Sequence, residues 1–207
     1  MHFRTRLLLS FLAMSAVQAI ASETVASPAQ IVEGDRLPAA TLHKADGSAL
    51  DLVAAVARKP AVLIFYRGGW CPYCNAHLAA LVDIEDDLKA MGVQLLAISP
   101  DQPSKLRDAP NRKVDPSYEL LSDSDMKLCD ALGISFTVAE ELVAKYKNEY
   151  KIDLEAASGR KHHKLPHPAV YVVGRDGVIR FAHVSKDYSK RLEPEKIIEA
   201  AKLVSGT

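Results

Sequence analysis

The chain has 207 residues, and its 26 lysine and arginine residues balance its 26 aspartate and glutamate residues. This balance argues against nucleic acid or an anionic membrane surface as the main partner, because both require an excess of positive charge. The length is that of one ordinary domain, whose core needs no disulfide support. The 3 cysteines therefore point to reactivity and not to a disulfide-stapled scaffold.

The N-terminal residues have the pattern of a bacterial Sec-type signal peptide. Arg4 and Arg6 precede an apolar run over residues 7–16, and the small residues Ala19 and Ala21 offer a cleavage site. The apolar run is shorter than the roughly 20 residues that span a bilayer. A cleaved signal peptide is therefore favoured over a retained membrane anchor.

These patterns divide the chain into three parts. Residues 1–21 are expected to be the signal peptide, residues 22–33 a flexible lead-in and residues 34–207 one domain. No second apolar run in the sequence approaches spanning length. We therefore expect a periplasmic or secreted protein that has no membrane association once the signal peptide is removed.

Apolar periodicity predicts alternating strands and helices in the domain. A buried strand, a helix and a second strand in this order form a right-handed βαβ unit, so an α/β fold is expected. The predicted elements are a strand at 41–43 turned by Asp46-Gly47, a buried strand at 61–66, one helix from 72 to Gly92, a strand at 93–99, a strand near 118–121, a helix at 126–132, a charged helix at 138–151, a loop at 156–164, a hairpin of 169–173 and 178–184, and a helix from about 192.

The motif Cys71-Pro72-Tyr73-Cys74 stands where the buried strand gives way to the long helix. Cysteines three residues apart place both sulfurs on one side of the first helical turn. The unpaired N–H groups of a helix N-terminus stabilise a thiolate and lower its pKa. Pro72 suits this turn, where its missing N–H costs nothing. We expect Cys71 at the exposed end of the helix and Cys74 deeper inside.

The segment from Phe65 to Cys74, FYRGGWCPYC, resembles the active-site segment of the alkyl hydroperoxide reductase and thiol-specific antioxidant group, the peroxiredoxin-like branch of the thioredoxin superfamily. The similarity continues through residues 120–123, 131–134 and 165–177. The resemblance implies a thioredoxin-like fold with a central mixed β-sheet flanked by helices. It also implies an antioxidant oxidoreductase that acts on thiols or disulfides without a cofactor or a metal.

The sequence departs from that family at two positions of the site. Alignment puts Cys74 at the peroxidatic position, but Cys71 then replaces a threonine, and Pro168 falls about where the family has an arginine. Both changes resemble thioredoxin, whose two cysteines face a cis proline. A cis bond before Pro168 would bring the backbone against the disulfide. The main hypothesis is therefore an exported thiol-disulfide oxidoreductase in which Cys71 attacks, Cys74 resolves, and His167 with Pro168 forms a docking wall.

Two alternatives remain at this point. The first is a thiol-dependent hydroperoxide reductase, in which a sulfenate on Cys74 is resolved by Cys71. The second is a copper- or zinc-handling protein that adds a histidine to the cysteine pair, with candidates at His77, His162, His163 and His167. The expected partners are a disulfide-bearing protein or a thioredoxin-like thiol donor, together with a hydroperoxide in the first alternative.

Four further features of the sequence concern supporting roles. Arg67 is a candidate to stabilise the thiolate, since a nearby cation lowers a thiol pKa, although a solvated arginine looks the same in sequence. Trp70 either shields the thiol or is an ordinary half-buried aromatic residue. Cys129 lies on a predicted helix among apolar residues, which favours an inert buried thiol over a resolving cysteine. Residues 62–66 contain no acid that would serve as a general base.

Overall fold

The computed structural model describes residues 29–108 and 116–206. The predicted signal peptide and most of the predicted lead-in lie outside these residues. Of the helices that are described, none is both long and apolar enough to cross a lipid bilayer.

Within the described residues, seven strands form one mixed sheet in the order β2-β1-β5-β4-β3-β8-β9. β3 runs parallel to β4, and β4 runs parallel to β5, whereas β8 lies antiparallel to β3. A separate ribbon pairs β6 with β7. The strands are β1 (Thr41–His43), β2 (Ala49–Asp51), β3 (Ala61–Phe65), β4 (Gln94–Ser99), β5 (Glu119–Ser122), β6 (Ser135–Thr137), β7 (Lys164–Pro166), β8 (Ala169–Val173) and β9 (Ile179–Val184).

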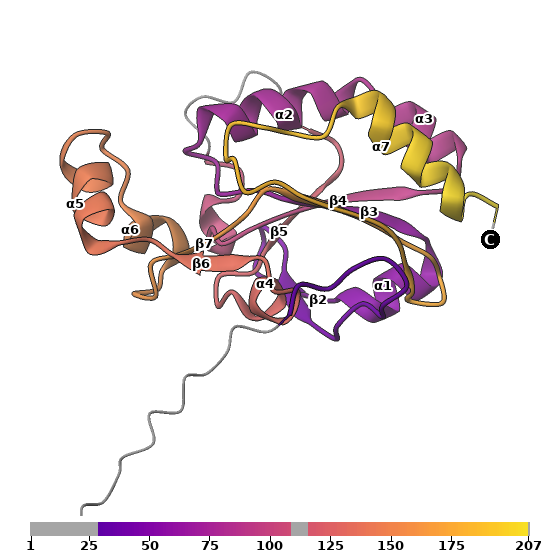
Figure 1. Ribbon diagram of the computed structural model, residues 1–207, viewed down its shortest axis with the longest axis horizontal. Coiled ribbons are helices and arrows are strands. Elements are labelled where there is room, and N and C mark those ends of the chain that lie inside the picture. The colour runs from indigo at the N-terminus through magenta and orange to yellow at the C-terminus, as the bar shows by residue number, and fades with distance from the viewer. Residues whose placement is uncertain (1–28, 109–115, 207) are drawn as a thin grey trace, which may run out of the picture.

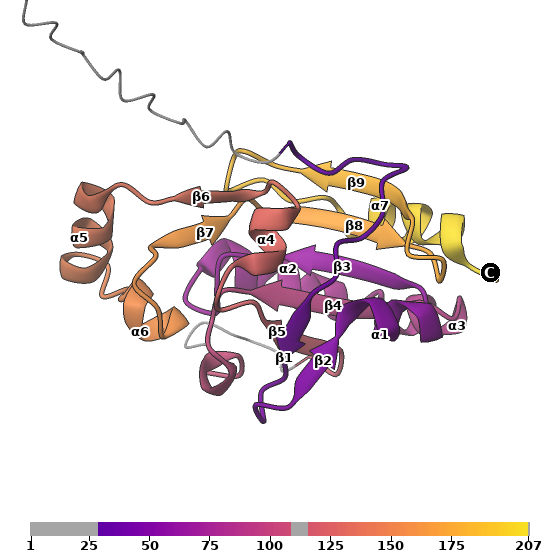
Figure 2. The same cartoon turned by 90° about the horizontal axis from the view of Figure 1, so that it is seen from below.

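Helices cover both faces of the sheet. Figure 1 shows α2, α3 and α7 above the sheet and α1 below it, and Figure 2 shows α5 and α6 at one end of the molecule, beyond the β6–β7 ribbon. The helices are α1 (Leu52–Arg58), α2 (Pro72–Val82), α3 (Glu85–Ala90), α4 (Lys127–Ala131), α5 (Glu140–Asn148), α6 (Leu154–Ser158) and α7 (Pro194–Ala201), with short 3₁₀ helices at Pro103–Lys105 and Lys202–Val204.

Strand β3 explains why the sheet has a core on each face. Its five residues are all buried and alternate between the two faces, as the period of a strand requires. Val62 and Ile64 pack with α2, α3 and α7, whereas Leu63 and Phe65 pack with α1 and α4. The prediction of an α/β fold with a central mixed sheet and flanking helices is confirmed.

The single helix predicted from residue 72 to Gly92 is wrong, because α2 ends at Val82 and α3 begins at Glu85. Aspartate and isoleucine, the two residues at the break, are weaker helix formers than the leucines and alanines around them. Leu81, Ile84 and Leu88 nevertheless pack into the same core cluster. The apolar stripe therefore survives the break, and this is why the periodicity did not reveal it.

Two local motifs were missed in the sequence. Asp51 caps α1 and Asp153 caps α6, each accepting a hydrogen bond from the backbone N–H three residues later. The prediction of a loop over 156–164 is therefore wrong at both ends, where α6 and β7 stand. These elements are short, and their conformation depends on caps and on packing more than on periodicity.

Candidate active site

The cysteine motif lies at the junction of β3 and α2, as predicted. Cys71 is the N-cap residue of α2, with extended backbone angles, and Pro72 occupies the first turn. The Cys71 carbonyl accepts the hydrogen bond from the N–H of Asn75 at 3.0 Å, which begins the helical pattern. The sequence folds in this way because proline is pre-organised for a helix start and the core stripe follows directly after it.

The two sulfurs differ in what they face. Cys71 is 2% exposed and Cys74 is 0% exposed, so the prediction that Cys71 sits at an exposed helix end is wrong. Cys71 lines a groove of about 650 Å³, and the aromatic side chains of Trp70, Tyr146 and Tyr188 line this groove with it. Cys74 belongs to the core beneath α2. Of the two thiols, Cys71 is therefore the one that an incoming molecule meets.

The protonation of the pair follows from this arrangement. The pKa of Cys71 is lowered to about 6, chiefly because the thiol of Cys74 donates a hydrogen bond to its sulfur. The positive charges of Arg67 and Arg191 lower this pKa further, whereas burial raises it. Burial, followed by the negative charge on Cys71, raises the pKa of Cys74. We therefore expect the pair to lose its first proton below neutral pH, mainly from Cys71, and to keep the second proton on Cys74.

Arg67 is held beside Cys71 by aromatic side chains. It is 5% exposed, and its guanidinium donates to the hydroxyl of Tyr146. The guanidinium carbon lies 5.3 Å from the ring centre of Trp70, 5.7 Å from that of Tyr146 and 4.9 Å from that of Tyr188. Such cation–π contacts keep a charged group in place without a carboxylate that would cancel its field. Arg67 thus supplies the cation that the sequence suggested.

Arg191 is a site residue that the sequence analysis missed. Its Nη2 atom lies 3.2 Å from the Sγ atom of Cys74, and its Nη1 atom donates to the carbonyls of Tyr188 and Lys190. The alignment left Pro168 where the family has an arginine, and the structure supplies a guanidinium from a different segment. Because 117 residues separate Arg191 from Cys74, no local pattern linked them.

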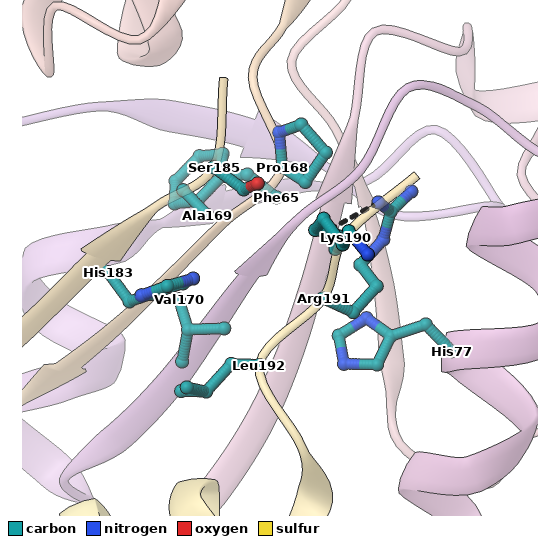
Figure 3. A pocket seen from close by; sticks show the side chains of 10 residues that line it. All are labelled: Phe65, His77, Pro168, Ala169, Val170, His183, Ser185, Lys190, Arg191 and Leu192. Atoms are coloured by element: carbon teal, nitrogen blue, oxygen red, sulfur yellow. Dashed lines mark hydrogen bonds between the residues drawn. The ribbon is translucent and has the colours of Figure 1, made fainter. Parts of the chain in front are cut away.

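A small cavity of about 10 Å³ lies behind the motif, between α2 and β8, and is lined by His77, Pro168 and Arg191 among others (Figure 3). His77 is 8% exposed, and burial together with the charge of Arg191 lowers its pKa to about 4. His77 is therefore neutral at physiological pH. In the described part of the chain, no three histidine, cysteine or acidic side chains gather as metal ligands, so the metal-handling alternative has no ligand set to support it.

A buried carboxylate braces the loop before Cys71. Asp101, which is 2% exposed just after β4, accepts a hydrogen bond from the N–H of Gly69 at 2.7 Å. Gly68 has a φ of +143°, and a Cβ atom there would lie 2.4 Å from Nε1 of Trp70. Only glycine fits this turn. The acid next to the motif thus comes from the residues that follow β4, the parallel neighbour of β3, and not from β3 itself.

The expectation of a cis bond before Pro168 is wrong, because the peptide bonds of residues 29–108 and 116–206 are all trans. The extended backbone is paired on both sides of this bond. The His167 N–H donates to the carbonyl of Ile134, and the Pro168 carbonyl accepts from the N–H of Ser185. The half-buried His167 ring packs on Phe136 with ring centres 4.7 Å apart. The docking wall of His167 and Pro168 remains a prediction.

Cys129 lies on the other face of the sheet from Cys71 and is 0% exposed. Its backbone N–H donates to the carboxylate of Asp123 at 2.9 Å. Burial and the charges of Asp123 and Asp130 raise its pKa well above the usual range. This surrounding fits the inert thiol expected from the sequence, since the sheet separates it from the other two sulfurs.

Comparison with known proteins shows which family the sequence matches. Residues 33–182 match the model of the AhpC/TSA family. Peroxiredoxin Bcp of Escherichia coli K12 is 32% identical over 101 residues, which cover 49% of this chain and 64% of that protein. The chloroplastic peroxiredoxin Q of Suaeda salsa is 29% identical over 171 residues, which cover 83% of this chain and 66% of that protein. The chain thus matches slightly less than two thirds of the length of these relatives.

Solved structures share the fold. Peroxidoxin BcpB from Mycobacterium tuberculosis superimposes with a TM-score of 0.65 at 17% identity, covering 86% of this chain and 100% of that one. Reduced Prx3 from Vibrio vulnificus, in complex with hydrogen peroxide, gives a TM-score of 0.63 at 22% identity, covering 83% and 99%. The thioredoxin-like fold that the resemblance implied is therefore confirmed.

Proposed function

Because the chain belongs to the AhpC/TSA family, we propose that it is a thiol-dependent hydroperoxide reductase whose reactive centre is the Cys71/Cys74 pair. The observation that carries the proposal is the position of Cys71, which is the N-cap residue of α2 and lines the groove together with Arg67, while Cys74 lies fully buried three residues further along the helix. Nucleophile and resolving group thus stand side by side. The relatives that bear the name peroxiredoxin support the hydroperoxide as oxidant.

The proposed reaction has two steps on the enzyme. The Cys71 thiolate attacks the terminal oxygen of a hydroperoxide, an S–O bond forms, the O–O bond breaks, and the alcohol or water leaves with a proton. Cys74 then attacks the Cys71 sulfenic acid, and water departs as the disulfide forms. One hydroperoxide is reduced by two electrons, and the dithiol is oxidised by two electrons. An external thiol must then reduce the disulfide.

We assign the first attack to Cys71, although the family alignment places Cys74 at the peroxidatic position. Nucleophilic attack requires the thiolate, and the pKa of Cys74 is raised while that of Cys71 is lowered. Arg67 and Arg191 both place positive charge where the thiolate and the breaking O–O bond carry negative charge. The guanidinium of Arg191 also stabilises Cys74 when this residue becomes a thiolate later in the cycle.

Stopped-flow mixing of the reduced protein with hydrogen peroxide tests the proposal. We expect fast oxidation, a sulfenate that can be trapped on Cys71 in Cys74→Ser, and no such species in Cys71→Ser. A sulfenate that forms quickly in Cys71→Ser but not in Cys74→Ser would move the peroxidatic role to Cys74. Slow oxidation of the wild-type protein, at the rate of an ordinary free thiol, would contradict peroxidase function altogether.

Thiol-disulfide exchange is the second candidate function, and the size of the groove favours it. A groove of about 650 Å³ is larger than hydrogen peroxide requires, and attack by Cys71 on a disulfide uses the same thiolate. Mixing the reduced protein with a model protein disulfide, in parallel with peroxide, compares the two oxidants directly. If the disulfide reacts faster at equal concentration, exchange becomes the preferred function.

We also propose that the protein is exported to the periplasm. The support is the sequence of residues 1–21, with two arginines, an apolar run and small residues before the expected cleavage site. N-terminal sequencing of the protein from fractionated bacterial cells is expected to begin at Ser22. A mature N-terminus at Met1 in the cytoplasmic fraction would contradict export.

A further inference from the structure

The groove above Cys71, which we term the aromatic groove, has walls of touching rings. On one wall Tyr150 contacts Tyr146, and Tyr146 contacts Trp70, with ring centres 6.1 Å and 5.9 Å apart. On the other wall Tyr73 contacts Tyr188 at 5.8 Å. These walls come from α5 with the residues after it, from α2, and from the segment after β9. The volume of the aromatic groove, about 650 Å³, lies within the range of small-molecule sites, roughly 300–1,000 Å³.

The charged side chains that line the aromatic groove are Arg67 and Lys151, and no acidic residue of the described chain lines it with them. Arg67 is 5% exposed, and its Nε atom has no hydrogen-bond partner among the described residues. Lys151 is exposed and stands in the left-handed backbone region, with a φ of +59°. The groove therefore combines apolar surface with two cations and an unused buried donor, which suits an organic anion.

We propose that the aromatic groove binds a small thiol that bears carboxylates and that this thiol is the reductant of the Cys71/Cys74 disulfide. The inference rests on the proposed function, which leaves that disulfide after each turnover. A thiol that reduces it must place its sulfur against Cys71, since Cys71 lines the groove and Cys74 does not. The rings pack the body of the thiol, and Arg67 and Lys151 hold its carboxylates.

The proposed reductive half-reaction balances as follows. The thiolate of the first thiol molecule attacks the Cys71 sulfur, a mixed disulfide forms, and Cys74 leaves as a thiolate beside Arg191 and takes up a proton. A second thiol molecule then attacks the sulfur of the bound thiol. The two thiol molecules leave as their disulfide, and Cys71 returns to the thiolate form.

Reduction of the preformed disulfide tests this inference without any peroxide. Trp70 is the one tryptophan in the sequence and precedes Cys71 directly, so its fluorescence reports the redox state. The probes are glutathione, a tripeptide thiol with two carboxylates, and its diethyl ester, compared at equal thiolate concentration. Glutathione is expected to react faster by roughly three- to tenfold, and salt should narrow the difference because exposed charges are screened.

The variant Lys151→Gln isolates the contribution of the groove. It is expected to slow reduction of the disulfide by glutathione by roughly two- to fivefold, because one exposed charge contact is lost. The rate of reduction by the diethyl ester should stay the same. Lys196→Gln on α7, an exposed lysine outside the groove lining, is the matched control and should change neither rate. Equal rates for the two probes, equal slowing of both by Lys151→Gln, or no reduction by either probe would overturn the inference. Since no peroxide is present, such a failure leaves the proposed peroxidase activity to its own stopped-flow test.

Discussion

Cys71 and Cys129 occupy similar positions on opposite faces of one sheet. Each lies at the start of a helix that follows a parallel strand, α2 after β3 and α4 after β5. Each is nearly inaccessible, at 2% and 0% exposure. Their pKa values nevertheless move in opposite directions, down to about 6 for Cys71 and well above the usual range for Cys129.

Neither burial nor a place at the start of a helix is therefore enough to make a cysteine reactive. Burial raises both thiol pKa values, so the neighbours decide the outcome. Cys71 has the thiol of Cys74 and two guanidinium groups, whereas Cys129 has Asp123 and Asp130. At α4 the N–H groups donate to the carboxylate of Asp123, so the positive end of that helix is already occupied by an acid.

Replacing Cys71 and replacing Cys129 should have very different effects on the reaction with peroxide. Cys71→Ser is expected to lower the rate of oxidation by hydrogen peroxide by roughly a thousandfold or more, because the activated nucleophile is lost. Cys129→Ser should leave this rate within about twofold, since the sheet separates it from the groove. Stopped-flow oxidation of both variants measures this. A large rate loss in a folded Cys129→Ser protein would show that the two faces act together.

Burial lowers the pKa of the His77 imidazole, whereas it raises the pKa of a cysteine thiol. The pKa of His77 is lowered to about 4 in the folded protein from an ordinary value of 6.5, so between these pH values the unfolded chain takes up a proton that the folded protein does not. The free energy of unfolding should therefore fall as the pH drops from 6.5 to 4, by up to about 3 kcal/mol. Urea unfolding at several pH values measures this free energy. In His77→Leu, the free energy of unfolding should depend less on pH between 6.5 and 4. An unchanged slope in that variant would assign the acid sensitivity to other groups.

Removing one cation gives the smallest of the three effects. Arg67→Gln is expected to raise the pKa of Cys71 by about one unit, since a nearby positive charge favours the thiolate. Alkylation by iodoacetamide, measured as a function of pH, should show a midpoint that moves upward from about 6. Arg180→Gln on β9, whose side chain pairs with Asp176, is the control and should leave the midpoint in place. If the midpoint stays the same in Arg67→Gln, the low pKa of Cys71 is caused mainly by the Cys74 hydrogen bond and by Arg191.

The features that sequence alone revealed are those with a short period or a local motif. The continuous apolar run of β3, the hairpin of β8 and β9, and the cysteines at a strand-to-helix junction each depend on neighbouring residues. These features were enough for the fold class and for the reactive centre. The short elements α1, α6, β6 and β7 escaped because a few residues carry too little periodicity to separate them from a loop.

The rest of the site could not be predicted because it is assembled from distant segments. Arg191 reaches Cys74 from the connection between β9 and α7, and Tyr146 reaches Arg67 from α5. A charged helix with no buried residues gave no sign that its one tyrosine contacts the active-site arginine. The protonation of the two cysteines depends on these contacts, so the sequence could name the pair but not divide the roles between its members.

Titration of thiolate absorbance in the reduced protein shows whether Cys71 is a thiolate at neutral pH. We predict one thiolate that appears with a midpoint near pH 6 in the wild-type protein and disappears in Cys71→Ser. If the wild-type protein shows no thiolate absorbance below about pH 8, Cys71 titrates as an ordinary cysteine and is not activated. A midpoint near pH 6 that persists in Cys71→Ser would assign the thiolate to another cysteine.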